Sequence, residues 1–253
     1  MKTEKNRFLS IVSAVAFGAT IAVNALAELL PIGGKTTGEI SDIYPSLLSP
    51  AGYAFMIWGL IYALVGWFVV YQLLPKNLAL AGKTAVLFSL SCVFNIVWLL
   101  AWHAEEILVS FIAIVALLCT LGFLAKVVQA EKWFVRLAFD IYFGWITAAT
   151  AASLFSTLTY FDPAWFDAKP VQALAVVVLL AVTLFAIINV VRAEGYAYSS
   201  TVAWAIIGII IKHLLPEPDG YAGRYLVVCI FAILALIALV TMIITTAVRS
   251  RKK

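Results

Sequence analysis

Apolar runs, each about 20 residues long, constrain this chain more than any other feature of its sequence. A helix rises about 1.5 Å per residue, so a run of this length crosses a hydrocarbon core of about 30 Å. Lipid offers the backbone no hydrogen-bond partner, so each run is predicted to be a helix. The sequence therefore predicts an all-α polytopic membrane helix bundle of about eight transmembrane helices. The expected spans are 8–29, 51–74, 84–103, 107–127, 134–156, 171–191, 197–215 and 226–248.

The composition excludes a water-soluble fold. Hydrophobic residues make up 64% of the chain and charged residues 12%, whereas a soluble domain has roughly 45–50% apolar and about 25% charged residues. The lipid bilayer is therefore the expected partner. The formal net charge of +4 is accounted for by basic loops on one side, so we expect contact with anionic lipid headgroups and no binding of nucleic acid.

The basic residues predict the orientation of the chain. With eight spans and a cytoplasmic start, thirteen of the 17 Lys and Arg residues fall on the inner side, as the positive-inside rule expects. We therefore expect both termini in the cytoplasm and a bacterial inner (plasma) membrane as the location. A cleaved signal segment that ends near Ala27 stays open as an alternative for residues 1–27. The seventh span ends in Lys212 and His213, whose side chains are expected to snorkel outward.

Aromatic residues recur at helical spacing in the second span. Phe55, Trp58 and Tyr62 are three and four residues apart, so they are expected to share one helix face. Anchoring at the membrane interface explains Tyr53 near the outer boundary. Trp58 and Tyr62 lie deeper, so that explanation suits them less well. Ligand contact and helix packing both stay open for this face.

The third and fifth spans carry similar patterns. Asn95 and Trp98 are three residues apart, and an Asn at membrane depth needs a partner. We expect Asn95 to face protein or a cavity, through either an interhelical hydrogen bond or a ligand. In the fifth span Tyr142, Trp145 and Ala149 share a side, next to a strip of small residues that favours close helix packing. That strip consists of Gly144, Ala148 and Ala152.

Three of these motifs, in chain order, resemble the TspO/MBR family of tryptophan-rich sensory or translocator proteins. Residues 50–62 read P-x-x-x-x-F-x-x-W-x-x-x-Y and are similar to the second-helix signature of that family. The N-x-x-W of Asn95 and Trp98 is similar to its third-helix motif. Tyr142 and Trp145 resemble its fifth-helix P-Y-x-x-W, with Ile141 in place of the proline. The resemblance covers about residues 8–157.

The resemblance implies a five-helix bundle over residues 1–157, followed here by a three-helix membrane extension over residues 158–253. Members of the family bind porphyrins, sterols and other apolar ligands in a pocket closed by the loop between helices one and two. The corresponding lid is residues 31–50. No cofactor is implied as a requirement, although a bound tetrapyrrole is compatible. The residues implied to line or support the pocket are Phe55, Trp58, Tyr62, Asn95, Trp98, Tyr142, Trp145 and Ala149.

The leading functional hypothesis is a membrane receptor or carrier that binds a planar apolar small molecule, such as a porphyrin, a haem or a sterol. The sequence contains no nucleophile–base pairing or phosphate loop, so we do not expect an enzyme, and porphyrin breakdown has no motif to support it. We also expect no metal site, because His103, Glu105 and Glu106 lack a fourth ligand.

Two other classes of function stay open. A secondary transporter of a small solute is disfavoured by the scarcity of deep charges and broken helices. A regulatory partner of another membrane complex would use the faces of small residues. The same faces also allow a homodimer.

Overall fold

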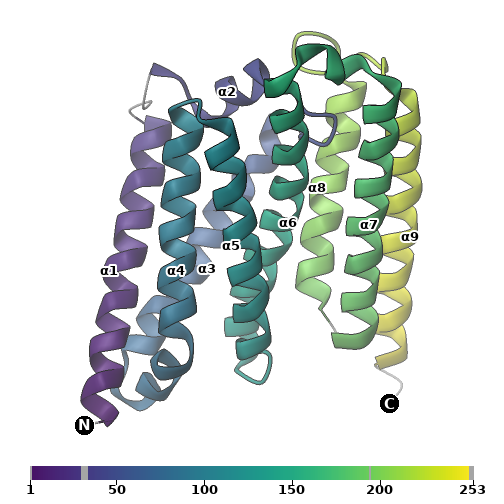
Figure 1. Cartoon of the computed structure of the whole chain (residues 1–253). Coiled ribbons are helices and arrows are strands. Elements are labelled where there is room, and N and C mark those ends of the chain that lie inside the picture. Colours follow the sequence, from purple (N-terminus) through teal and green to yellow (C-terminus); the bar gives the residue numbers. More distant parts are fainter. Residues whose placement is uncertain (1, 30–33, 194, 251–253) are drawn as a thin grey trace. The chain divides into compact units, whose positions relative to one another are not determined.

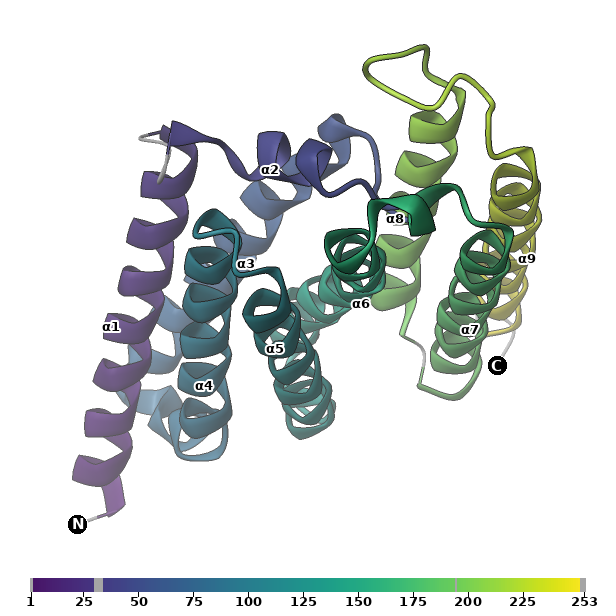
Figure 2. The ribbon, with the colours of Figure 1, turned by 45° about the horizontal axis from the view of Figure 1, so that its top comes forward.

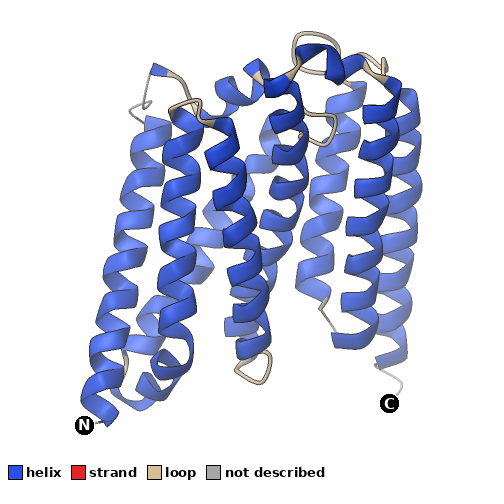
Figure 3. Cartoon of the chain, in the orientation of Figure 1, coloured by secondary structure: helices blue, strands red, loops and turns tan. Residues whose placement is uncertain are grey.

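The computed structural model describes residues 2–29, 34–193 and 195–250, apart from the side chains of residues 28, 29 and 193. Positions 31–33 of the predicted lid and 251–253 of the predicted inner side lie outside the described residues. Every described residue is in a helix, a turn or a loop (Figure 3). Eight of the described helices are long and apolar enough to cross a membrane. This confirms the predicted all-α membrane fold.

The spanning helices follow one another along the chain, with short helices between some of them (Figure 1). The first five spans lie on α1 (Lys2–Leu29), α3 (Ile57–Leu73), α4 (Leu78–His103), α5 (Ile107–Val128) and α6 (Trp133–Phe161). The last three lie on α7 (Lys169–Ala193), α8 (Tyr196–Leu214) and α9 (Leu226–Ser250). The short helices are α2 (Thr37–Ile43), η2 (Gly52–Met56), η3 (Pro75–Asn77) and η4 (Pro163–Asp167).

The chain divides into two compact units. The N-terminal unit consists of Met1–Ile40 and Trp58–Phe143, and the C-terminal unit consists of Ser41–Ile57 and Gly144–Lys253. Within the N-terminal unit, α4 packs against both α1 and α5 (Figures 1 and 2). Within the C-terminal unit, α7, α8 and α9 pack against one another. Helix α6 is continuous across the division, so its first part belongs to one unit and its second part to the other.

Four phenylalanine rings meet in the N-terminal unit. Phe68 lies 4.8 Å from Phe139 and 5.2 Å from Phe88 between ring centroids, and both pairs meet edge to face. Phe17 lies 6.3 Å from Phe88. The rings come from α1, α3, α4 and α6, and edge-to-face contacts of this kind are favourable beyond the apolar area that they bury. They hold together the four helices that also carry the candidate site.

The C-terminal unit is built on close contact between α6 and α8. A Cβ atom at Gly144 would lie only 2.8 Å from the carbonyl oxygen of Tyr198 and 2.9 Å from Cβ of Thr201. The hydroxyl of Tyr198 donates a hydrogen bond of 3.0 Å to Oγ1 of Thr147. Gly144 therefore allows α8 to approach α6 directly, which confirms the close packing predicted for the small-residue strip at this position.

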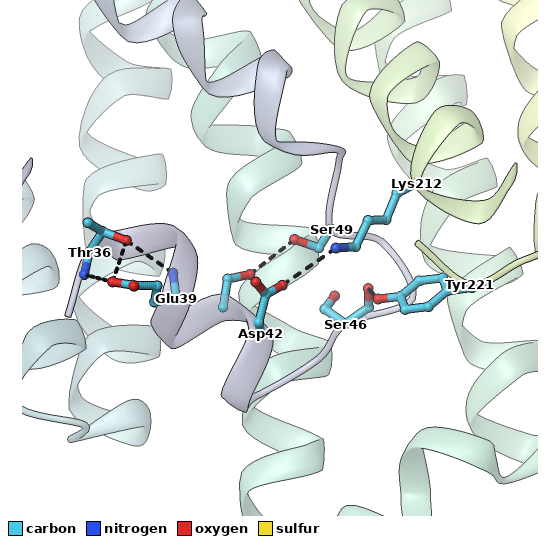
Figure 4. Close-up of polar contacts among 8 residues, drawn as sticks. Thr36, Glu39, Asp42, Ser46, Ser49, Lys212 and Tyr221 are labelled. Carbon is cyan, nitrogen blue, oxygen red and sulfur yellow. Dashed lines mark hydrogen bonds and ion pairs between the residues drawn. The ribbon is translucent and has the colours of Figure 1, made fainter. Parts of the chain in front are cut away.

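The end of α8 differs from the sequence prediction. His213 is fully buried, and its Nε2 donates a hydrogen bond of 2.9 Å to the carbonyl oxygen of Leu47. Nζ of Lys212 lies 3.5 Å from Oδ1 of Asp42 (Figure 4). The expectation that His213 snorkels outward is wrong, because the segment before η2 supplies a backbone acceptor for Nε2 of the ring inside the protein.

Candidate ligand-binding site

Four aromatic side chains meet in the N-terminal unit, and we refer to Trp58, Tyr62, Trp98 and Tyr142 as the tryptophan cluster. Trp58 stacks on Tyr62 with ring centroids 5.3 Å apart and planes 21° apart. It also stacks on Trp98 at 6.0 Å and 27°. Tyr142 meets Trp58 edge-on at 5.9 Å. Three helices, α3, α4 and α6, thus bring predicted site residues together.

A chain of hydrogen bonds holds the two tyrosines of this cluster. The hydroxyl of Tyr62 donates to Oδ1 of Asn24 at 2.6 Å. Nδ2 of Asn24 donates to Oδ1 of Asn95 at 2.9 Å and to the carbonyl oxygen of Thr20 at 2.8 Å. Nδ2 of Asn95 donates to the hydroxyl of Tyr142 at 3.1 Å. Asn95 is fully buried and therefore faces protein, through the interhelical hydrogen bonds that were one of its two predicted roles.

The indole of Trp98 carries a donor that the rest of the cluster leaves unused. Its side chain is 7% exposed, and its Nε1 has no hydrogen-bond partner among the described residues. An indole N–H can only donate, and a buried donor without an acceptor costs roughly 1–3 kcal/mol. An acceptor on a bound molecule would remove that cost. Trp58 and Tyr62 are only half-buried, so part of the cluster stays accessible.

The other three predicted site residues lie in the C-terminal unit. Phe55 meets Trp145 edge-on with ring centroids 5.6 Å apart, and Trp145 is 1% exposed. Ala149 lies one turn further along α6 and is half-buried. Phe55 belongs to the 3-10 helix η2, whereas α3 begins at Ile57. The predicted second span therefore begins with a 3-10 turn, and the common face of Phe55, Trp58 and Tyr62 stays a prediction.

Asn24 was not among the predicted site residues, although its side chain bonds to two of them. It donates to Asn95 and accepts from Tyr62, so it links α1 to both α4 and α3. The signal that could have found it is the one used for Asn95. An amide at membrane depth needs a partner, and another buried amide is a suitable one.

The first part of the predicted lid contacts the end of α4 and the turn between α4 and α5 within the N-terminal unit. Nζ of Lys35 lies 2.6 Å from Oε1 of Glu105, and both side chains are partly exposed. Oγ1 of Thr37 lies 3.2 Å from Nε2 of His103, and Nε1 of Trp102 donates to the carbonyl oxygen of Thr37 at 3.2 Å. His103 and Glu105 thus bond to the lid segment.

A capping box starts α2 inside the lid. The N–H and hydroxyl of Thr36 both donate to Oε2 of Glu39, at 2.7 and 2.9 Å, and the N–H of Glu39 donates back to Oγ1 of Thr36 at 3.3 Å (Figure 4). This is the reciprocal arrangement that satisfies two donors at a helix start. The bonds from Thr36, together with the charge of Lys35, lower the pKa of Glu39 from its ordinary value.

The fold and the site define an integral membrane protein with buried aromatic clusters and, among the described residues, eight candidate spanning helices. A family profile described as TSPO-like protein matches residues 10–245, nearly the whole chain. The chain therefore belongs to the TSPO-like protein family, and the match continues past residue 157 into the last three spans. A search of curated proteins and a search of solved structures each found no match.

Proposed function

We propose that this protein is a membrane receptor or carrier that binds a planar apolar small molecule at the tryptophan cluster. The observation that carries the proposal is the buried, unpaired N–H of Trp98 beside the stacked rings of Trp58 and Tyr62. Stacked rings favour a flat apolar guest. A single convergent donor would fix the orientation of that guest, as is common in apolar binding sites.

A porphyrin-like tetrapyrrole suits the side chains of this cluster. Its flat ring system would stack on Trp58 or Trp98, and an acceptor on its edge would take the N–H of Trp98. The hydroxyls of Tyr62 and Tyr142 are already engaged with Asn24 and Asn95. The cluster therefore favours a guest that needs no axial ligand, such as a metal-free porphyrin, over haem iron. Binding of this kind requires no chemical step, so we propose a binding protein and not an enzyme.

A fluorescence titration with protoporphyrin IX tests this function. Trp98→Phe keeps an aromatic ring but removes the N–H, so affinity should fall about 2- to 10-fold, the effect of one hydrogen bond. Trp58→Leu removes a stacking surface and should weaken binding by about 10-fold. The matched control is Trp67→Phe, because Trp67 is 66% exposed and should leave affinity unchanged. Unaltered binding in both cluster variants would refute the proposal.

We further propose that both termini lie in the cytoplasm and that the host membrane is a bacterial inner membrane. The excess of basic residues in the loops assigned to the inner side supports this orientation. The outer side keeps Lys35, Lys169, Lys212 and Arg224. Alkaline phosphatase fused after α9 should be inactive and a fluorescent protein fused there should fold. The opposite pair of results would reverse the proposed topology.

A further inference from the structure

One turn of α8 holds the segment that precedes α3, and both belong to the C-terminal unit. The N–H of Ala51 donates to the carbonyl oxygen of Gly208 at 3.0 Å. Nε1 of Trp204 donates to the carbonyl oxygen of Ala54 at 3.1 Å. The ring of Trp204 also meets Tyr53 edge-on at 5.4 Å. Residues 204 and 208 are one turn apart, so these contacts come from a single face of α8.

Gly208 makes this contact sterically possible. A Cβ atom at Gly208 would lie 2.6 Å from Cβ of Pro50 and 3.1 Å from Cβ of Ala54. Neither atom is the end of a flexible side chain, so a larger residue at position 208 would push residues 50–54 away from α8. Small residues at helix contacts serve this purpose in membrane proteins.

The same helix supports both partners of the Phe55–Trp145 pair. Phe55 directly follows Ala54 within η2, so its ring moves with the residues that α8 holds. Trp145 directly follows Gly144, which packs on Tyr198 of α8. The pair itself meets edge to face at 5.6 Å and 85°. The position of each ring therefore depends on a different turn of α8.

We propose that Trp204 and Gly208 are positioning residues, which set the geometry of the Phe55–Trp145 pair within the C-terminal unit and through it the affinity of that pair for a ligand. A helix of the C-terminal extension thereby supports the two predicted ligand residues that lie in the same unit. The statement about affinity rests on the proposed function, since Phe55 and Trp145 are predicted ligand residues. The statement about geometry is independent of any ligand.

The ligand-independent test is ¹⁹F NMR of the whole protein labelled with 5-fluorotryptophan. The resonance of Trp145 is assigned by its loss in Trp145→Phe. Phe55→Leu removes a neighbouring ring and should shift that resonance. Gly208→Val should shift it in the same direction, and it should add no further shift in the Phe55→Leu background. The matched control is Gly18→Val, because a Cβ atom at Gly18 meets nothing within 4 Å.

Two results would overturn the geometric statement. In the first, Phe55→Leu shifts the Trp145 resonance but neither Gly208→Val nor Trp204→Phe does. In the second, Gly208→Val shifts the Trp145 resonance as much in the Phe55→Leu background as in the wild type. That result would mean that α8 affects the position of Trp145 independently of Phe55. Should Gly208→Val fail to fold, Trp204→Phe decides, because it removes only the N–H bond to Ala54 and keeps an aromatic ring.

The test of affinity is a protoporphyrin IX titration of the same variants. Gly208→Val should weaken binding by the same factor as Phe55→Leu, about 2- to 10-fold for one aromatic contact. The double variant should bind no more weakly than either single variant. Normal affinity in Phe55→Leu would overturn the statement about affinity. Absence of porphyrin binding in the wild type would refute the proposed function, while the ¹⁹F shifts would still decide the geometry.

Discussion

The polar chain between Asn24 and Asn95 offers the sharpest test of how the N-terminal unit is held together. We expect Asn24→Leu and Asn95→Leu each to destabilise the protein, because Leu keeps the branching at Cγ but its side chain can neither donate nor accept a hydrogen bond. Asn24→Leu removes the bonds to Tyr62 and Asn95, and Asn95→Leu removes the bonds to Asn24 and Tyr142. The bond between the two amides is the one that both variants share.

The magnitude follows from these bonds. Interhelical hydrogen bonds in membrane proteins contribute about 0.6 kcal/mol on average and about 1.7 kcal/mol at most in double-mutant cycles. Each single variant loses two such bonds, so each should lose about 1–3 kcal/mol of unfolding free energy. The double variant should lose less than the sum of the two, by the roughly 0.6–1.7 kcal/mol of the shared bond.

The assay is equilibrium unfolding of the four proteins in bicelles or mixed micelles, followed by tryptophan fluorescence. The matched control is Asn189→Leu, because the side chain of Asn189 bonds to the carbonyl oxygen of Phe185 in its own helix. That variant should change the unfolding free energy by less than about 0.5 kcal/mol. Additive effects of Asn24→Leu and Asn95→Leu, within about 0.3 kcal/mol, would contradict a direct bond between these two amides.

Three further predictions concern the lid and the contact between α6 and α8. The pKa of Glu39, measured from its carboxyl ¹³C signal, should lie below the ordinary value of 4.5. The capping bonds should therefore stabilise the protein above that pH, and this stabilisation should be lost as the pH falls through the lowered pKa. Thr36→Val should bring the pKa of Glu39 back toward 4.5. Glu105→Gln removes a partly exposed ion pair and should lower the hydrogen-exchange protection of residues 36–40 by at most about 1 kcal/mol. Gly144→Val should destabilise the protein by about 1–3 kcal/mol in the same unfolding assay, whereas Gly18→Val should not.

The spanning helices could be predicted because their signal is local. Twenty apolar residues in a row dictate a helix whatever the neighbours are. The same signal fixes the first and last residues of a helix less well than it fixes the presence of the helix. Helix α4 begins at Leu78 and not near residue 84, because a helix can continue beyond the hydrocarbon core. The short helix α2 was not predicted, although Thr36 and Glu39 carry the spacing of a capping box.

The candidate site was predictable in residue type and only partly in arrangement. The sequence identified Asn95 as an amide in need of a partner, but Asn24 lies 71 positions away and only the fold brings the two together. The sequence also predicted one spanning helix from residue 51, whereas Gly52–Met56 form the 3-10 helix η2 and α3 begins at Ile57. His213 shows the same limit, because its acceptor, Leu47, lies 166 positions earlier in the chain.

The binding of a planar guest at the tryptophan cluster is tested most directly by NMR of ¹⁵N-labelled tryptophan side chains during addition of protoporphyrin IX. The indole N–H signal of Trp98, assigned by its loss in Trp98→Phe, should move as the porphyrin binds. The signals of Trp67 and Trp133, whose side chains are 66% and 74% exposed, should stay in place. A porphyrin that binds while the Trp98 signal remains fixed would contradict the account.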